Sequence, residues 1–265
     1  GGTARALKDA AVPVTTVSEL TGFPEILDGR VKTLNPMIHG GILARKDIPS
    51  HLEELRIHGI LPFDLVVANL YPFSRTIEKP GSSLGEALEM IDIGGPAIVR
   101  AAAKNFGSVA VVVNPERYQT VLDEITEEVG ISFATRLVLA REAFSHTCLY
   151  DCSVAAFLSH LDEEGEPAAE IFPETLLLTG KKVQDLRYGE NPHQQAAFYA
   201  SKDSAEPGLA GARQLWGKEL SYNNILDADA AIQLTRDFTQ PACVIIKHTN
   251  PCGAALAESA AQAYS

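Results

Sequence analysis

Short apolar runs alternate along the chain with longer segments in which apolar residues recur every three or four positions. The short runs are rich in Val, Ile and Leu, which predicts strands buried on both faces of a sheet, at residues 64–70, 108–114 and 242–247. The periodic segments predict helices at residues 83–91, 96–105 and 115–130. This alternation of strands and helices is typical of a layered α/β domain with a largely parallel sheet.

Prolines and a glycine mark several ends of the predicted helices. Pro96 and Pro115 stand in first turns, where a missing N–H group costs nothing, and Gly130 stands at a C-terminal end. Thr3 follows two glycines and precedes a helical pattern, so we expect it to cap the first helix. The stretch from Phe133 to Leu161 predicts either one long helix or two helices in series.

The pattern changes at residue 162. Residues 162–182 are acidic, contain two prolines and lose the helical period, which predicts a linker or a crossover between domains. We therefore expect a first domain over residues 1–162, a linker over residues 163–182 and the beginning of a second α/β domain over residues 183–265.

Composition narrows the possible functions. The 265 residues are 46% hydrophobic, which is enough for a sizeable core, and the formal net charge of −12 disfavours binding to nucleic acids. No apolar run approaches the roughly 18 residues that a membrane span needs, and no signal peptide is recognisable. The four cysteines show neither a CxxC pair nor a zinc-ribbon spacing, so we expect reduced, mostly buried thiols in a cytoplasmic protein.

Residues 27–43 form a loop-like stretch that is dense in groups able to bind an anion. Arg30 and Lys32 alternate on one side of an extended segment, Thr33 offers a hydroxyl, and a later glycine pair permits close backbone approach. Taken alone, this stretch is equally compatible with an ordinary solvated loop.

Asn69 and Tyr71 lie at the carboxyl end of the first predicted strand, where α/β folds bind their ligands. A tyrosine that packs its ring and points its hydroxyl at solvent is the simpler explanation of this position. The sequence therefore leaves both interpretations open.

The stretch 91–105 leads from a polar turn into a predicted helix. Asp92, Gly94 and Gly95 precede the helix, so free N–H groups of the turn are available to an anion or a carbonyl oxygen. Arg100 and Lys104 are four residues apart and share a helix face. A capped helix with a solvated basic face explains the same pattern.

Two polar stretches follow in the second part. Residues 186–199 contain Arg187 and Tyr188, which suit a phosphate and a flat base respectively. Residues 220–231 place Ser221 and two asparagines just before a helix, as expected of a binding segment or of a capped helix start.

Residues 244–253 (VIIKHTNPCG) run from an apolar strand into Lys247 and His248 and then into a turn that contains Cys252. A Lys-His pair suits proton transfer, because a desolvated lysine and a histidine both titrate near neutrality. A nucleophilic Cys252 needs a base and an orienting third group, and the sequence offers only His248 nearby. We favour the Lys-His pair and assign Cys252 to turn packing.

The order of these motifs resembles a known enzyme family. The segments GGTARAL, VSELTGFPEILDGRVKTLNPMIHGGILAR, NLYPF and IDIGGPAIVRAAAKN closely resemble the cyclohydrolase half of the bacterial-type bifunctional purine biosynthesis proteins. That family combines phosphoribosylaminoimidazolecarboxamide formyltransferase with IMP cyclohydrolase. LRYGENPHQ, SYNNILDADAA and KHTNPCG look like the opening of its formyltransferase half, so the resemblance covers nearly the whole chain.

The resemblance implies a methylglyoxal-synthase-like α/β domain that closes the second purine ring, followed by the start of a cytidine-deaminase-like α/β domain. In the first domain it implies catalytic roles for Lys32, Tyr71, Asp92 and Lys104. It also implies a nucleotide site lined by Gly1, Gly2, Thr3, Arg30, Thr33, Asn69, Gly94 and Gly95.

In the second domain the resemblance implies formyl transfer from the co-substrate 10-formyltetrahydrofolate to an aminoimidazole carboxamide ribonucleotide. Lys247 and His248 would handle the protons and the developing oxyanion, and Arg187 and Tyr188 would bind the nucleotide. The family implies a homodimer and requires neither a metal nor a bound cofactor.

The resemblance also implies that family segments are absent from this chain. The family begins with a strand and a Ser-Asp-Lys-Thr-Gly segment before the Gly-Gly-Thr turn, and most of its formyltransferase half follows the last motif found here. We therefore expect weak or no formyl transfer by these residues alone. Two rival functions are a regulatory module of the same fold that binds a phosphate ligand, and a cysteine hydrolase built on Cys252.

Overall fold

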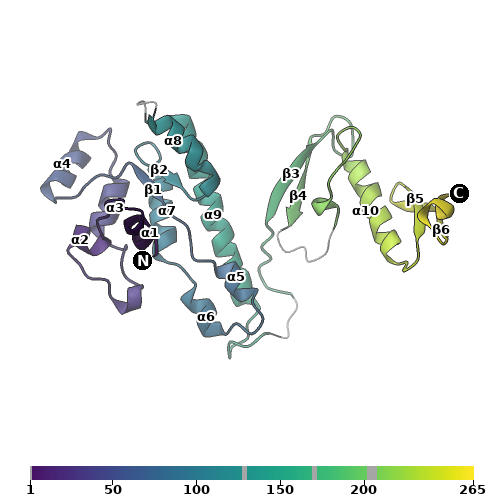
Figure 1. Cartoon of the computed structure of the whole chain (residues 1–265), viewed down its shortest axis with the longest axis horizontal. Helices are drawn as coiled ribbons and strands as arrows, with labels where there is room; N and C mark the ends of the chain where they lie inside the picture. Colours follow the sequence, from purple (N-terminus) through teal and green to yellow (C-terminus); the bar gives the residue numbers. More distant parts are fainter. Residues whose placement is uncertain (1, 127–129, 169–171, 202–207) are drawn as a thin grey trace. The chain divides into compact units, whose positions relative to one another are not determined.

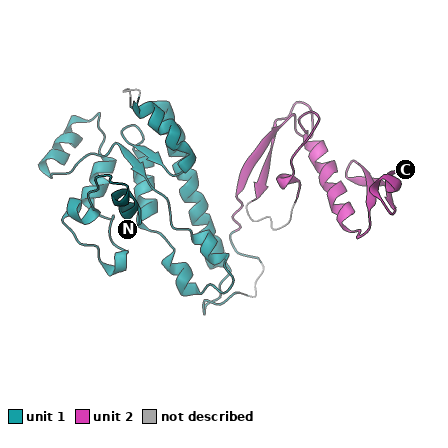
Figure 2. Cartoon of the chain, in the orientation of Figure 1, with its two compact units in different colours: residues 1–175 teal, residues 176–265 magenta. Residues whose placement is uncertain are grey.

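The computed structural model describes residues 2–126, 130–168, 172–201 and 208–265. It divides the chain into two compact units, Gly1–Thr175 and Leu176–Ser265, which Figure 2 shows in teal and magenta. The division falls inside the linker predicted over residues 163–182. The last residues of that predicted linker differ from the expectation, because they already belong to a strand that begins at Gly180.

Unit 1 combines helices with a short parallel pair of strands (Figure 1). Its strands are β1 (Leu65–Val67) and β2 (Ala110–Val112). Its α-helices are α1 (Gly2–Asp9), α2 (Val17–Thr21), α3 (Pro36–Leu43), α4 (Pro49–Ile57), α5 (Phe73–Ile77), α6 (Leu84–Glu89), α7 (Gly94–Lys104), α8 (Tyr118–Thr126) and α9 (Phe133–Ser159). Two 3₁₀ turns, η1 (Leu27–Gly29) and η2 (Pro115–Arg117), complete it.

The core of unit 1 lies where α7 and α9 pack together and against β2. Ala102 of α7 and Ala143 of α9 are fully buried, and their small side chains allow the two helix backbones to approach closely. β2 is buried along its whole length, as the apolar run predicted, whereas Val67 of β1 remains 53% exposed. The predicted parallel pairing is confirmed, with Val66 opposite Val111.

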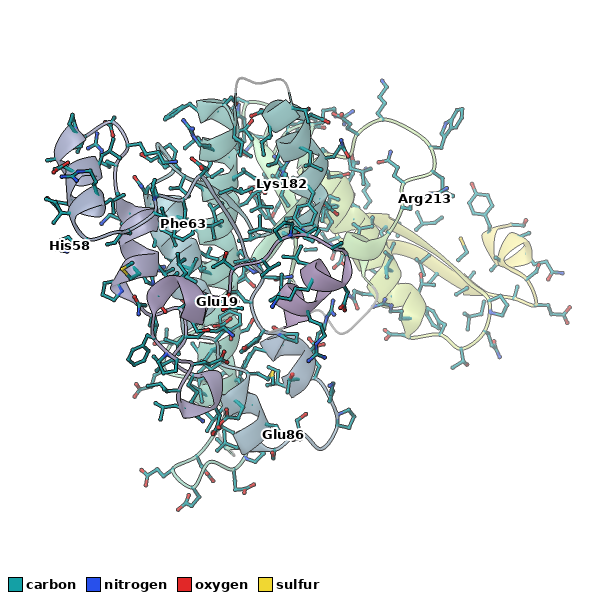
Figure 3. The ribbon with its side chains drawn as sticks, turned by 60° about the vertical axis from the view of Figure 1, so that its left-hand side comes forward. Glu19, His58, Phe63, Glu86, Lys182 and Arg213 are labelled. Atoms are coloured by element: carbon teal, nitrogen blue, oxygen red, sulfur yellow. The ribbon has the colours of Figure 1, made fainter. Side chains whose placement is uncertain are left out.

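Local capping signals fix several helix ends. Thr16 and Ser83 form capping boxes with Glu19 and Glu86 at the starts of α2 and α6, and both glutamates are labelled in Figure 3. Ser132 caps α9, which runs without a break and so settles the choice between one helix and two.

Unit 2 contains two antiparallel hairpins and a central helix. β3 (Gly180–Leu186) pairs with β4 (Ala196–Ser201), and β5 (Ala242–Lys247) pairs with β6 (Asn250–Leu256). Between the hairpins lie the 3₁₀ turn η3 (Leu209–Gly211) and the helix α10 (Tyr222–Arg236), and α11 (Ala260–Tyr264) follows the last strand. The two hairpins are separate two-stranded sheets.

Three sequence expectations about local structure are wrong. Thr3 lies inside α1 rather than at its N-cap. The loop predicted over residues 27–43 contains α3, because Ile38 and Ile42, one turn apart, are buried in the core and Asn35 caps the helix. The strand at 242–247 is not buried on both faces. It belongs to a hairpin with one open face among the described residues, where Ile245 is 53% exposed.

The cysteines also differ from expectation. All four are free, but Cys148 and Cys252 are exposed and Cys152 and Cys243 are only half-buried. Cys148 lies on the outer side of α9, and Cys252 lies in β6, every residue of which is exposed. Cys252 therefore belongs to a strand and not to a packed turn.

Candidate functional site

The turn before α7 is held by its own polar groups. The N–H group of Gly95 donates a hydrogen bond of 2.8 Å to Oδ1 of Asp92. A Cβ atom at residue 95 would stand 2.3 Å from Oδ2 of Asp92 and 2.9 Å from Cδ2 of Leu70, so a larger residue there would displace both side chains. The Asp92 carboxylate thus satisfies one of the free N–H groups at this helix start.

Three segments from distant parts of the sequence meet at this turn. A Cβ atom at Gly94 would lie 2.7 Å from Oγ1 of Thr33, so the Thr33 hydroxyl stands directly beside the helix start. Leu70, which lies against Gly95, is flanked by Asn69 and Tyr71 at the carboxyl end of β1. Tyr71 is 57% exposed. The structure therefore brings Thr33 to Gly94 and Leu70 to Gly95, and Asn69 and Tyr71 are the sequence neighbours of Leu70.

Tyr150 of α9 forms hydrogen bonds to the backbone of this turn. Its hydroxyl accepts a hydrogen bond from the N–H group of Asp92 and donates one to the carbonyl oxygen of Met90, both at 2.7 Å. Burial raises the pKa of Tyr150, so the hydroxyl stays protonated and can donate. Tyr150 also packs edge-on against Phe73 of α5, with 6.2 Å between ring centroids.

Arg30 and Lys32 are already ion-paired. Arg30 pairs with Glu89 of α6, and Nζ of Lys32 lies 2.6 Å from a carboxylate oxygen of Glu25. The hydrogen bond from Lys32 lowers the pKa of Glu25, which keeps that carboxylate charged. Arg30 is exposed, whereas the Lys32 side chain is about two-thirds covered, with 32% of its surface accessible.

Gly2 and Thr3 are exposed residues of α1, and among the described residues no hydrogen bond joins α1 to this cluster; Gly1 lies outside the described ranges. Lys104 ends α7, about 15 Å along the helix axis from Gly94 at 1.5 Å per residue. Its role in ring closure stays a prediction.

In unit 2, the side chains of Arg187 and Tyr188 contact each other. The Arg187 guanidinium lies over the Tyr188 ring at 5.0 Å and donates a hydrogen bond of 3.3 Å to its hydroxyl. Hydrogen bonding by Ser221, and then by Arg187, lowers the pKa of Tyr188. The Tyr188 carbonyl accepts a hydrogen bond from the N–H group of Tyr222, so this pair docks onto the start of α10.

Lys247 and His248 lie at a hairpin turn that contacts the same helix. His248 and Thr249 both have left-handed backbone angles, with φ of 53° and 61°, which is unfavourable for a β-branched threonine. The N–H group of Thr249 donates a hydrogen bond of 2.8 Å to Oδ1 of Asp227 in α10. Lys247 and His248 are both exposed. Both polar motifs of unit 2 are therefore hydrogen-bonded to α10.

Sequence reasoning missed Tyr150 and Asp227. Both act through contacts to segments far along the chain, 58 residues away for Tyr150 and 22 for Asp227, and a single helical position shows no sign of such a contact. No group of three or more His, Cys, Asp or Glu side chains suited to a metal ion occurs in the part of the chain that the structure describes. Within that part, no helix has the length and apolarity of a membrane span.

Comparisons with known proteins match two family models to the chain, and the boundary between the two matches lies inside α7. A family model described as AICARFT/IMPCHase bienzyme matches residues 102–265, and a model of the MGS-like domain matches residues 1–97. A bifunctional purine biosynthesis protein PurH from Desulfitobacterium hafniense (strain DSM 10664 / DCB-2) is 56% identical over 266 residues, covering 100% of this chain and 51% of the relative. One from Listeria monocytogenes serotype 4b (strain F2365) is 52% identical over 264 residues, with the same coverage.

A solved structure described as "Crystal structure of ForH" superposes with a TM-score of 0.53 at 40% identity, covering 58% of this chain and 80% of that one. The chain spans about half the length of the curated relatives it matches. The family model extends over more than half of the chain, and its match includes both polar motifs of unit 2. On these matches, the chain belongs to the AICARFT/IMPCHase bienzyme family, with an MGS-like domain at its start.

Proposed function

We propose that unit 1 carries the IMP cyclohydrolase chemistry of the family, the dehydrative ring closure of a formylated aminoimidazole carboxamide ribonucleotide. A nitrogen of the substrate attacks the formyl carbon of the same molecule, the carbonyl oxygen becomes anionic and takes up a proton, and water leaves. Positioning supplies much of the rate because both reacting groups belong to one molecule.

The residues around the start of α7 suit these tasks. The N–H group of Gly94, and that of Gly95 once it leaves the Asp92 carboxylate, offer donors to a developing oxyanion, and the Thr33 hydroxyl stands beside them. Asp92 and Tyr71 provide a carboxylate and a phenol for proton transfer, and Lys32 provides a cation once it leaves Glu25. Arg30 would contact the nucleotide after leaving Glu89 in the same way.

We further propose that unit 2 supplies part of a formyltransferase site. Arg187 and Tyr188 would bind the nucleotide, His248 would take the proton from the attacking amine, and Lys247 would stabilise the oxyanion formed on the formyl group of 10-formyltetrahydrofolate. Because the chain spans about half of its relatives, we expect weak or no formyl transfer by these 265 residues alone. A cytoplasmic homodimer with nucleotide and folate substrates, and with no bound cofactor, completes the proposal.

One observation carries the ring-closure proposal: Asp92, Gly94 and Gly95 of one turn meet Thr33 from a distant segment. The test is to incubate the chain with the formylated nucleotide and to follow the ultraviolet absorbance of the purine product. We expect a steady rise in the wild-type chain. Absence of any rise, at concentrations where the nucleotide demonstrably binds, would contradict the proposal.

That contrary result would favour the rival regulatory module, which binds a phosphate ligand without catalysis. Family membership disfavours that rival, since the matched relatives are named as bifunctional biosynthesis proteins. A cysteine hydrolase is disfavoured as well, because no hydrogen bond joins Cys252 to a base within the described residues. If thiol alkylation leaves the rate in the absorbance assay unchanged, the cysteine hydrolase hypothesis is excluded.

A further inference from the structure

Two cysteines lie one turn apart on α9. Cys148 and Cys152 are four residues apart in a helix that runs without a break from Phe133 to Ser159, so their side chains leave the same face of the helix. Cys148 is exposed, Cys152 is half-buried, and both are free thiols. The proposed ring-closure site uses neither of them.

The two thiols contact each other. A side-chain hydrogen bond joins Cys152 to Cys148. Burial raises the pKa of Cys152, and the neighbouring Cys148 thiol and Asp151 carboxylate raise it further, so Cys152 keeps its proton at neutral pH. A metal cation bound between the two sulfur atoms would reverse this effect, because a coordinating thiol gives up its proton.

Helix geometry opposes a disulfide between these thiols. Side chains four residues apart on a helix have Cβ atoms about 5–6 Å apart, whereas a disulfide needs about 3.5–4.5 Å. Closing that bond would distort the turn of α9 that contains Tyr150, whose hydroxyl is hydrogen-bonded to Met90 and Asp92. Two metal–sulfur bonds of about 2.3 Å each allow the sulfur atoms to stand up to about 4.6 Å apart, a span that suits an intact helix.

The number of ligands narrows the choice of ion. Among the described residues, no group of three or more His, Cys, Asp or Glu side chains is suited to a metal ion, so this pair offers two sulfur ligands without a third protein ligand. Zinc takes four protein ligands in structural sites and three in catalytic sites. Monovalent copper is a soft ion that prefers thiolates, and two sulfur atoms in a line complete its coordination.

We propose that Cys148 and Cys152 form a binding site for a soft monovalent metal cation, Cu⁺. The ion bonds to both sulfur atoms, the two thiol protons pass to solvent, and copper keeps its oxidation state. The product carries one net negative charge and lies at the exposed Cys148 position, where water can solvate it. The proposal does not rest on the ring-closure function.

The experiment is an anaerobic titration in which the chain competes with bathocuproine disulfonate for Cu⁺, followed by the visible absorbance of the copper–chelator complex. We expect the wild-type chain to withdraw one ion per chain. Cys148→Ala and Cys152→Ala should each weaken the binding of Cu⁺ at least about a hundredfold, because a chelating pair becomes a single ligand. Alanine favours a helix, and circular dichroism checks that both variants are folded.

The matched controls are Cys243→Ala and Cys252→Ala. These thiols lie in the β5–β6 hairpin of unit 2, where Cys243 is opposite Ala255 and not opposite Cys252. We expect each control to bind Cu⁺ as the wild type does, within about twofold. Zinc ions at tenfold excess over copper should not displace it, since the pair lacks the further ligands that zinc needs.

The proposal is overturned if the wild-type chain withdraws no copper, if either α9 variant shows a smaller loss than expected, or if a control variant shows an equal loss. One ion bound per two chains would mean that two copies share it, which also overturns the proposal. So would displacement by zinc, or a Cys148–Cys152 disulfide found by mass spectrometry after the anaerobic titration. Binding of one ion per chain that both α9 cysteines require, and that both controls keep, supports the proposal.

Discussion

The hydroxyl of Tyr150 lies 2.7 Å from the backbone nitrogen of Asp92, although 58 residues separate them. The same hydroxyl donates to the carbonyl oxygen of Met90, so one side chain of α9 spans residue 91 and fixes the turn that leads to Gly94 and Gly95. A group that holds the turn without facing a substrate is a positioning residue for the proposed ring closure.

Replacing Tyr150→Phe removes both hydrogen bonds and keeps the packing against Phe73. We expect kcat for ring closure to fall about tenfold with KM changed far less, because the turn donors lose their alignment in the transition state. We also expect about 1 kcal/mol lower unfolding free energy. Tyr118→Phe on exposed α8 is the control. A Tyr150→Phe enzyme whose kcat is unchanged would contradict the positioning role.

Replacing Gly95→Ala places a Cβ atom 2.3 Å from the Asp92 carboxylate, which must then move away from the Gly95 N–H group that it accepts from. We expect ring closure to be lost and unit 1 to be destabilised by about 1–3 kcal/mol in urea unfolding, as in other overpacked sites. Gly85→Ala in α6 is the matched control, since its nearest neighbour stands 4.0 Å away, and it should be neutral or slightly stabilising. Similar activities for the two variants would remove the steric argument.

His146 of α9 predicts a specific pH dependence. Burial lowers its pKa from the ordinary 6.5, and its Nε2 atom is buried with no hydrogen-bond partner among the residues that the structure describes. Below about pH 6.5 the unfolded chain takes up a proton that the folded chain excludes, so the unfolding free energy falls as the pH drops through the folded pKa. Above pH 6.5 both states are neutral and this contribution to stability is complete.

The measurement is urea unfolding between about pH 5 and pH 8 for the wild type and for His146→Gln. Part of the fall in unfolding free energy at low pH should be absent from the variant, and protonation of carboxyl groups should account for the rest. The exposed His58, which is labelled in Figure 3, supplies the control His58→Gln, and that variant should retain the wild-type profile. Parallel profiles for the wild type and His146→Gln would refute the prediction.

The contact between Asp227 and the hairpin turn is a fourth test. Removing the carboxylate with Asp227→Ala leaves the Thr249 N–H group to solvent and releases a turn with two left-handed residues. We expect amide exchange at Thr249 to accelerate about five- to tenfold. Asp227→Asn keeps an acceptor oxygen and should show a smaller change. Asp229→Ala, on the same helix, should have no effect, and an equal acceleration there would show that α10 itself had loosened.

Sequence patterns predicted the elements whose signals are local. The Val-rich run at 108–114 gave β2, the periodic stretch at 96–105 gave most of α7, and Ser and Thr caps with prolines marked helix starts. α3 was mistaken for a loop because its glycine pair lowers helix propensity. Burial of Ile38 and Ile42 outweighs that cost of roughly 1 kcal/mol per glycine.

The candidate sites were predictable as sets of residues but not as geometry. Asp92, Gly94 and Gly95 are neighbours in sequence, and the structure keeps them together. The contact of Thr33 with Gly94, the support by Tyr150 and the place of Lys104 at the far end of α7 depend on how helices pack, which no local pattern encodes.

If Arg30 and Lys32 bind the nucleotide as proposed, each must first leave a carboxylate, Glu89 in the case of Arg30 and Glu25 in the case of Lys32. An arriving phosphate would displace these two carboxylates, so the proposed site presents little net positive potential to attract it from a distance. We therefore expect association to be governed by how often the two glutamates swing away, and to respond weakly to ionic strength. In the proposed site, Glu25 and Glu89 therefore occupy the positions of the ligand's anionic groups and hold Lys32 and Arg30 in place until a ligand displaces them.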